Sequence, residues 1–113
     1  MTKNELPPTL TDEERSRALE LAMQARRERT RLKQYMKAGR VSLADALGEE
    51  CARRLPVCQL IASVPGIGVS KAERIMLALH IAQNRRVGGL GPRQREALLA
   101  LEESGWDPAL YRK

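Results

Sequence analysis

A glycine-containing turn between two apolar stretches constrains the fold of this chain more than any other feature. Residues 60–72 read Leu-Ile-Ala-Ser-Val-Pro-Gly-Ile-Gly-Val-Ser-Lys-Ala, which predicts a helix, a tight hairpin and a second helix. Gly66 and Gly68 have no Cβ atom, so the backbone can take a positive φ and a partner can approach closely. The amides of the hairpin and of the following helix N-terminus point outward, and such a group of donors prefers an anion.

We therefore predict a phosphate-binding hairpin, formed by Pro65, Gly66, Ile67, Gly68, Ser70 and Lys71. A change of Gly68 to Asp is expected to weaken phosphate binding by bulk and charge. Little loss of stability is expected, because an aspartate near a helix N-terminus interacts favourably with the helix dipole. The alternative is that the hairpin merely links two packed helices.

A second glycine cluster, Gly88, Gly89 and Gly91, follows the basic pair Arg85-Arg86. The next residue, Pro92, suits the first turn of a helix. This cluster alone is explained equally well as the end of a helix. Two such turns with arginines beside both, however, favour a nucleic acid held at two phosphates.

The charge balance and the scarcity of aromatic residues narrow the class of partner. The chain has 113 residues, which is enough for one domain with a small core. It has 20 Lys and Arg against 14 Asp and Glu, with a net charge of +6, and this suits a polyanion. Only Tyr35, Trp106 and Tyr111 are aromatic, so no row of stacking platforms for single strands is present and duplex backbone is the more natural target.

The cysteines and the N-terminal residues bear on the compartment. Cys51 and Cys58 do not form a CxxC pair, and His80 is the only histidine, so the sequence predicts free thiols and neither a metal nor another cofactor. Residues 1–8 contain no apolar signal segment, and no run of about 18 apolar residues occurs. We expect a cytoplasmic protein that does not bind a membrane.

The pattern along the chain predicts four segments and an all-α fold. They are a flexible arm over residues 1–10, a long basic helix within 11–40, a helical domain over 41–105 and a tail over 106–113. Thr11 and Glu14 form a predicted capping box at the start of the long helix, and Gly39 ends it. Trp106, Leu110 and Tyr111 of the tail either fold back on the core or offer a partner site.

The long helix carries a thin apolar stripe and a basic one. Arg26, Arg29, Lys33 and Lys37 share a face that could follow a phosphate backbone, although exposed basic residues are also ordinary on a solvated helix. We expect this face to be a second, separable DNA surface. The apolar stripe consists of Ala18, Leu21, Ala22, Ala25, Leu32 and Met36.

Further helices are predicted over about 43–55, 56–63, 70–79 and 92–104 from their first-turn residues and the spacing of their apolar residues, and no stretch alternates long enough with the period of a strand to make a sheet. Ser42 is the predicted cap of the first, with Asp45 at the capping-box position. The predicted core positions lie beyond residue 40, so the domain is expected to fold after removal of residues 1–40. These positions are Leu60, Ile61, Val64, Ile75, Leu79 and Leu98.

From Pro7 to about Leu101 the sequence resembles the actinobacterial type of integration host factor, a family of small nucleoid-associated proteins. These proteins have a long N-terminal helix followed by a helix-two-turns-helix domain. The matching residues are Pro7-Pro8, Leu10-Thr11, residues 25–29, residues 64–68, Ala72, Ile75-Met76, residues 85–87, residues 89–91 and Arg93-Gln94.

The resemblance implies a monomer that binds duplex DNA with little sequence preference and contributes to chromosome compaction, topology or site-specific recombination. A topoisomerase or recombinase is an implied protein partner. The hairpin would meet the minor-groove side, while the long helix and the second turn hold the backbone. The second turn would contribute Arg85, Arg86, Gly89, Gly91, Arg93 and Gln94. Val69 and Gly88 depart from the family, which usually has basic residues there, so weaker binding is expected.

Two other classes of protein use a similar helix-turn-helix element. A ribosomal protein with a similar helix-two-turns-helix would bind rRNA, but its long basic C-terminal tail has no counterpart after Gly105. A helix-hairpin-helix glycosylase would need a carboxylate beside its nucleophile, and no Asp occurs between Asp45 and Asp107. Gly88 to Gly91 also lack the Lys and Ser/Thr of a nucleotide-binding loop. The sequence therefore predicts a binding protein and not an enzyme.

Overall fold

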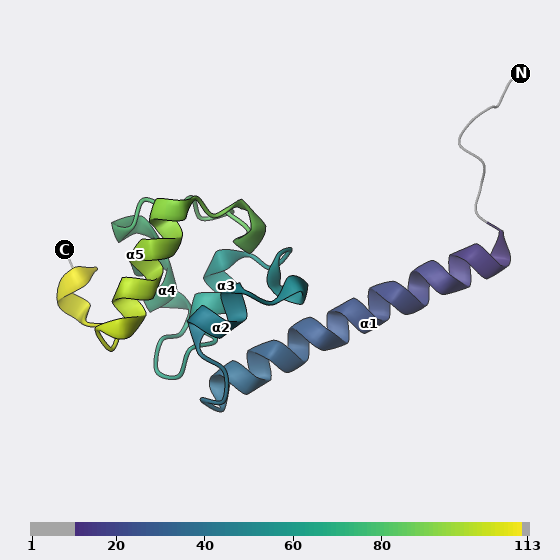
Figure 1. Ribbon diagram of the computed structural model, residues 1–113, viewed down its shortest axis with the longest axis horizontal. Helices are drawn as coiled ribbons and strands as arrows, with labels where there is room; N and C mark the ends of the chain where they lie inside the picture. The colour runs from purple at the N-terminus through teal and green to yellow at the C-terminus, as the bar shows by residue number, and fades with distance from the viewer. Residues whose placement is uncertain (1–10, 112–113) are drawn as a thin grey trace, which may run out of the picture.

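The computed structural model describes residues 11–111, and within that range the protein contains helices and turns and no strand, which confirms the all-α prediction (Figure 1). The expected arm over residues 1–10, the matched Pro7-Pro8 and the terminal Arg112 and Lys113 lie outside the described residues. The elements are α1 (Asp12–Lys37), α2 (Leu43–Leu47), η1 (Glu50–Ala52), α3 (Val57–Ala62), α4 (Val69–Ala78), η2 (Val87–Gly89), α5 (Pro92–Glu103) and η3 (Pro108–Leu110).

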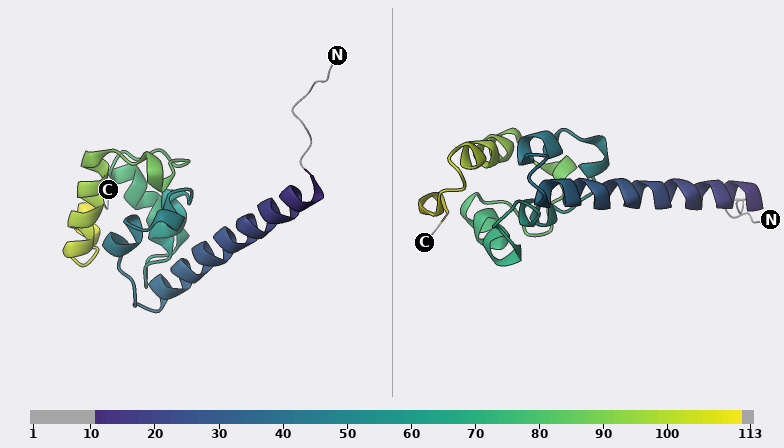
Figure 2. Two further views of the ribbon diagram at one scale, coloured as in Figure 1. Left: turned by 45° about the vertical axis from the view of Figure 1, so that its right-hand side comes forward. Right: turned by 90° about the horizontal axis from the view of Figure 1, so that it is seen from below.

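Helix α1 is a rod that leaves the compact part of the molecule (Figures 1 and 2). The described molecule measures 62 × 29 × 22 Å. The predicted capping box is confirmed, since the Thr11 hydroxyl accepts from the Glu14 N–H and the Thr11 N–H donates to the Glu14 carboxylate. These contacts from Thr11, through its backbone first and then its side chain, lower the pKa of Glu14.

Only the C-terminal half of α1 packs on the rest of the protein. Residues 11–24 are all exposed, and Leu21 keeps 62 % of its surface in solvent. Leu32 and Met36 are buried in the main core, at 7 % and 0 % exposure. The apolar stripe therefore fixes the end of the helix to the domain and leaves its beginning free.

The helix predicted over 43–55 is wrong beyond Leu47. Helix α2 ends there, Gly48 is its C-cap, and Glu49 is extended with φ −81° and ψ 132° before the short η1. Gly48 disfavours continuation of the helix, since glycine is a poor helix-interior residue. In addition, the Leu55 carbonyl accepts from the Val87 N–H at 2.9 Å, so this part of the chain pairs with a distant segment. Ser42 caps α2 as predicted by accepting from the Asp45 N–H at 3.1 Å.

The N-terminus of α2 is also held by Glu102 on α5. The carboxylate of Glu102 accepts from the Leu43 N–H at 2.6 Å and from the Ala44 N–H at 3.0 Å. These are two of the amides that a helix start leaves without an internal partner. One side chain of α5 thus fastens α2 across a long sequence separation.

We expect Glu102→Ala to lower the stability by about 1–2 kcal/mol, because two amides lose a charged acceptor. The melting temperature would fall by roughly 5–10 °C. Thermal unfolding followed by circular dichroism measures this, with Glu103→Ala on the exposed side of α5 as the matched control. Equal melting temperatures of the two variants would contradict the fastening role of Glu102.

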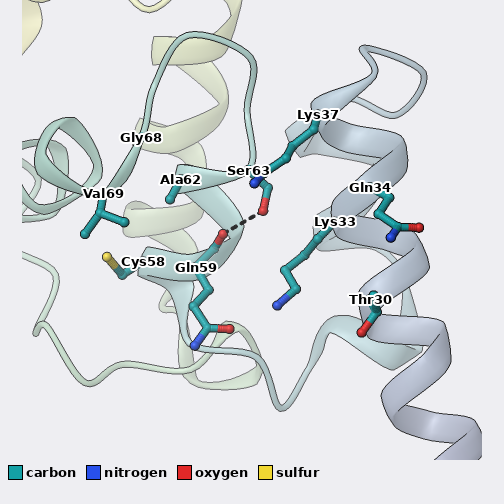
Figure 3. Close-up of a pocket in the computed structure, with 10 residues that line it drawn as sticks. All are labelled: Thr30, Lys33, Gln34, Lys37, Cys58, Gln59, Ala62, Ser63, Gly68 and Val69. Atoms are coloured by element: carbon teal, nitrogen blue, oxygen red, sulfur yellow. Dashed lines mark hydrogen bonds between the residues drawn. The ribbon is translucent and has the colours of Figure 1, made fainter.

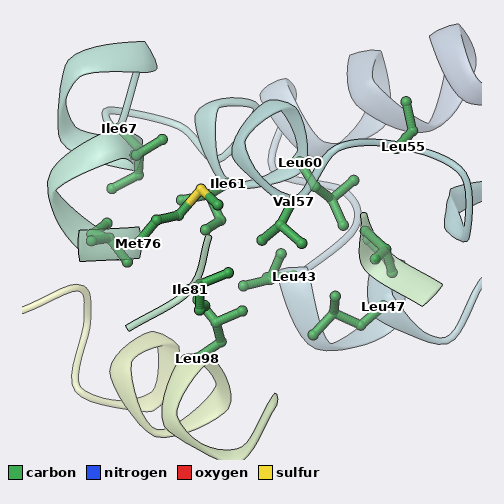
Figure 4. Close-up of a cluster of buried hydrophobic side chains, with 14 of the residues drawn as sticks. Leu43, Leu47, Leu55, Val57, Leu60, Ile61, Ile67, Met76, Ile81 and Leu98 are labelled. Atoms are coloured by element: carbon green, nitrogen blue, oxygen red, sulfur yellow. The ribbon is translucent and has the colours of Figure 1, made fainter. Parts of the chain in front are cut away.

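One hydrophobic core joins all five α-helices. Figure 4 shows a part of it, with labelled side chains from α2, α3, α4 and α5. Val64 and Leu79 of the predicted core are only half-buried, and Trp106 and Tyr111 pack against the core, which settles the fold-back alternative for those two residues of the tail. The fully buried large side chains are Met36, Leu43, Val57, Leu60, Ile61, Ile75, Met76, Val87, Leu98 and Leu101.

Because Leu32 and Met36 belong to this core, the expectation that residues 41–105 fold without the first 40 residues does not fit the packing. Among the described residues, no helix is long and apolar enough to cross a membrane. The same range contains no cluster of three or more His, Cys, Asp or Glu side chains that could hold a metal ion.

Candidate nucleic-acid interface

The hairpin between α3 and α4 presents two open glycines on an anchored turn. Gly66 has φ +83°, as predicted, and Gly68 has φ +77°. A Cβ atom at either would meet nothing within 4 Å, so both glycines face solvent. Between them Ile67 is buried, at 7 % exposure, and its N–H donates to the Val64 carbonyl at 3.0 Å. Both the side chain and the N–H of Ile67 are thus used inside the protein, so this residue anchors the turn, and the expectation that the hairpin amides point outward is wrong at Ile67.

The first turn of α4 continues this donor surface. Gly68 is the N-cap and provides no side-chain hydrogen bond, so the N–H groups of Val69, Ser70 and Lys71 point out of the helix without an internal partner. All three residues are exposed. Lys71 also stabilises the turn, because its Nζ donates to the Gly66 carbonyl at 3.2 Å. Amides, helix dipole and one ammonium group therefore point to the same anion-binding surface.

A cleft lies between this hairpin and α1, and we call it the hairpin cleft. Its volume is about 490 Å³. Lys33 and Lys37 point from α1 into the gap toward α3, while Gly68 and Val69 form the opposite wall (Figure 3). The remaining lining residues are Thr30, Gln34, Cys58, Gln59, Ala62 and Ser63. The predicted basic stripe therefore does not lie apart from the hairpin, since two of its four residues border it.

The second glycine turn is held by hydrogen bonds to the first residue of α3 and to the segment before it. Val57 donates to the Arg85 carbonyl at 2.9 Å, and the guanidinium of Arg86 donates to the carbonyl of Arg54. The guanidinium of Arg85 folds over Gly89 and donates to its carbonyl at 2.8 Å. A Cβ atom at Gly89 would lie 3.3 Å from the Arg85 side chain, so the glycine makes room for that arginine.

Gln94 of α5 has a structural role in the same region. Its amide oxygen accepts from the Gly91 N–H at 3.1 Å, and its amide nitrogen donates to the His80 carbonyl at 2.9 Å. The first bond caps the start of α5, and the second ties it to His80, just after the end of α4. Arg93 is exposed beside it and Gly91 is half-buried.

A second cleft, which we call the arginine cleft, lies between α1 and the second turn. Its volume is about 810 Å³, and four arginines line it against two glutamates. Its lining residues are Ala25, Glu28, Arg29, Glu50, Cys51, Arg53, Arg54, Arg86, Gly88 and Gly89. Arg29 therefore lines the same cleft as residues of the second turn. Arg26 is exposed on α1 and lines neither cleft.

Sequence reasoning missed Arg53 and Arg54. The doublet itself is a visible signal, but its nearness to the second turn depends on the backbone contacts of Leu55 with Val87 and of Arg53 with Gly88. These contacts join segments more than 30 residues apart in the sequence. No local pattern predicts them.

The two cysteines are half-buried free thiols. Burial raises the pKa of Cys58 and the negative charge of Glu73 adds to this; burial likewise raises the pKa of Cys51, with Glu49 and Glu28 adding to it. Both thiols are therefore protonated near neutral pH. They contribute apolar surface to the two clefts and no activated nucleophile.

This chain is similar to a known domain family and to known proteins. The model of the S13-like H2TH domain family matches residues 28–101. The integration host factor of Mycobacterium tuberculosis is 46 % identical over 96 residues, which cover 81 % of this chain and 91 % of that protein. The integration host factor of Streptomyces coelicolor is 42 % identical over 97 residues, which cover 82 % of this chain and 90 % of that protein.

A solved structure is similar as well. It is the structure of sIHF bound to an 8-bp palindromic DNA, with a TM-score of 0.66 and 35 % sequence identity. The match covers 75 % of this chain and 97 % of that chain.

Proposed function

This chain belongs to the integration host factor family of actinobacteria and contains the S13-like H2TH domain, and on that premise we propose that it is a nucleoid-associated protein that binds duplex DNA with little sequence preference. The observation that carries the proposal is the hairpin. Its open glycines, the three outward amides of α4 and the lysines of the hairpin cleft converge on one surface. A DNA phosphate is the anion that such a surface fits.

The second turn and the two clefts would provide further contacts with DNA phosphates. Arg85 and Arg86 each use one nitrogen within the protein, and the other donors of each guanidinium remain for phosphates. We also assign Arg93, Gly89 and Gly91 to this contact, whereas Gln94 supports the start of α5 from within the protein. On α1, Arg29 lines the arginine cleft and Lys33 and Lys37 line the hairpin cleft, and we assign these residues and the exposed Arg26 to the same positive face.

Weak sequence preference follows from the chemistry of these groups. Backbone amides, lysines and arginines at turns recognise phosphates, which carry no base information. We propose accordingly that the protein is a binding protein without enzymatic activity. It would act at the nucleoid as a monomer in chromosome compaction, topology or site-specific recombination, with a topoisomerase or recombinase as its protein partner.

Binding to duplex DNA is expected to depend strongly on salt. If about four to six phosphates are neutralised, a plot of log K against log[salt] should have a slope of roughly −4 to −5. Fluorescence anisotropy with a random-sequence duplex measures the slope. The same strand unpaired and a structured RNA are the comparison ligands, because few aromatic side chains are present for stacking. A slope near zero, or tighter binding of the single strand or the RNA, would contradict the proposal.

A further inference from the structure

Arg53 lies over Gly88 in the arginine cleft. The Gly88 N–H donates to the Arg53 carbonyl at 2.9 Å. A Cβ atom built at Gly88 would stand 3.2 Å from that carbonyl oxygen, 3.5 Å from Nε of Arg53 and 3.6 Å from its Cβ. Gly88 is also not one of the glycines with positive φ in the described chain. The backbone angle therefore does not require glycine there, and the absent side chain leaves the room that Arg53 occupies.

The guanidinium of Arg53 is free to bind a ligand. Within residues 11–111, the side chains of Arg29, Arg53 and Arg54 have no hydrogen-bond or ion-pair partner, although Glu28 and Glu50 line the same cleft. Arg53 is exposed, so no burial cost keeps its charge from a ligand. An unpartnered guanidinium offers five donors in a planar fork, the geometry that matches two phosphate oxygens.

We propose that Arg53 is a phosphate-contact residue of this protein and that it supplies, through the space above Gly88, the positive charge of the second turn. This inference rests on the proposed function and names a contact that the second turn alone does not contain. Arg86, which lines the same cleft, has one donor committed to the Arg54 carbonyl. Arg53 has no such commitment and is the stronger candidate for a phosphate.

The test compares four variants with the wild type by salt-dependent anisotropy on a random-sequence duplex. Arg53→Ala is expected to weaken binding about fivefold and to make the salt slope shallower by about one, as for one lost phosphate contact. Arg53→Lys keeps the charge and is expected to keep the slope. The double change Arg53→Ala with Gly88→Arg presents an arginine from the other side of the same contact and is expected to restore the slope. Arg31→Ala is the matched control, since Arg31 is exposed on α1 and does not line the arginine cleft.

Circular dichroism and thermal unfolding accompany each variant. A folded Arg53→Ala protein with the wild-type slope, or a slope lowered equally by Arg31→Ala, would overturn the assignment of Arg53 while duplex binding by the wild type still supported the proposed function. Failure of the wild type to bind duplex would overturn both. If the double variant does not fold, the contrast between Arg53→Ala and Arg53→Lys decides the question alone.

Discussion

Replacing Gly68 with aspartate is expected to lower the affinity for duplex DNA by more than about tenfold, because a carboxylate would stand among the amides that face the phosphate. Stability is expected to fall as well. Gly68 has φ +77° and ψ 173°, a backbone region that only glycine adopts readily, so a side chain there costs about 1–3 kcal/mol. The sequence-based expectation that stability would barely change is therefore wrong. A Cβ atom at Gly68 would meet no other atom within 4 Å, so the cost in stability comes from the backbone angles alone.

Substitutions of Val69 test the effect of charge at the same surface without the backbone strain at Gly68. It is the first residue of α4, it is 61 % exposed, and it follows the glycine directly. Val69→Glu places a negative charge where the helix dipole favours it by about 0.3–1 kcal/mol, so the variant is expected to stay folded and lose affinity. Val69→Lys is expected to gain affinity. Urea unfolding and anisotropy measure the two effects, and equal affinities of the two folded variants would show that the hairpin is only a linker.

The parts of the fold that sequence predicts well are those with strong local signals. Thr11 with Glu14 marks the start of α1, and Pro92 and Gly105 bound α5 within a residue or two. The course of the segment after Leu47 depends instead on the backbone contact of Leu55 with Val87, which joins residues far apart in the sequence. Tertiary contacts of this kind override helix propensity.

The same contrast holds for the candidate site. The hairpin is contiguous in sequence, so its glycines identify it, and the angle of Gly66 follows the prediction. The two clefts join α1 to segments far along the chain, and only the structure brings Arg53 to Gly88 or Lys37 to Gly68. It also reveals the internal partners of Lys71, Arg85 and Gln94, three residues that composition alone presents as free donors.

The two halves of α1 are expected to respond very differently to truncation. Among the described residues, deletion of residues 1–24 removes only exposed side chains. It removes three basic and five acidic residues, and the basic stripe of α1 is retained because it begins at Arg26. We expect this shortened protein to keep the wild-type free energy of unfolding and to bind and compact DNA as the full chain does. The exposed start of α1 contributes almost no packing that could be lost.

Deletion of residues 1–40 is expected to unfold the domain, because it removes Leu32 and Met36 from the core. Truncation of one buried Leu or Met side chain costs about 2–5 kcal/mol, so the loss of both approaches the total stability of a small domain, which is about 5–15 kcal/mol. Met36→Ala in the full chain isolates one of the two, with Leu19→Ala, 61 % exposed, as its matched control. Denaturant unfolding monitored by circular dichroism would show a large loss for Met36→Ala and almost none for Leu19→Ala. If residues 41–113 instead unfold as cooperatively and as late as the chain that lacks residues 1–24, then α1 is an appendage of the domain and not a part of its core.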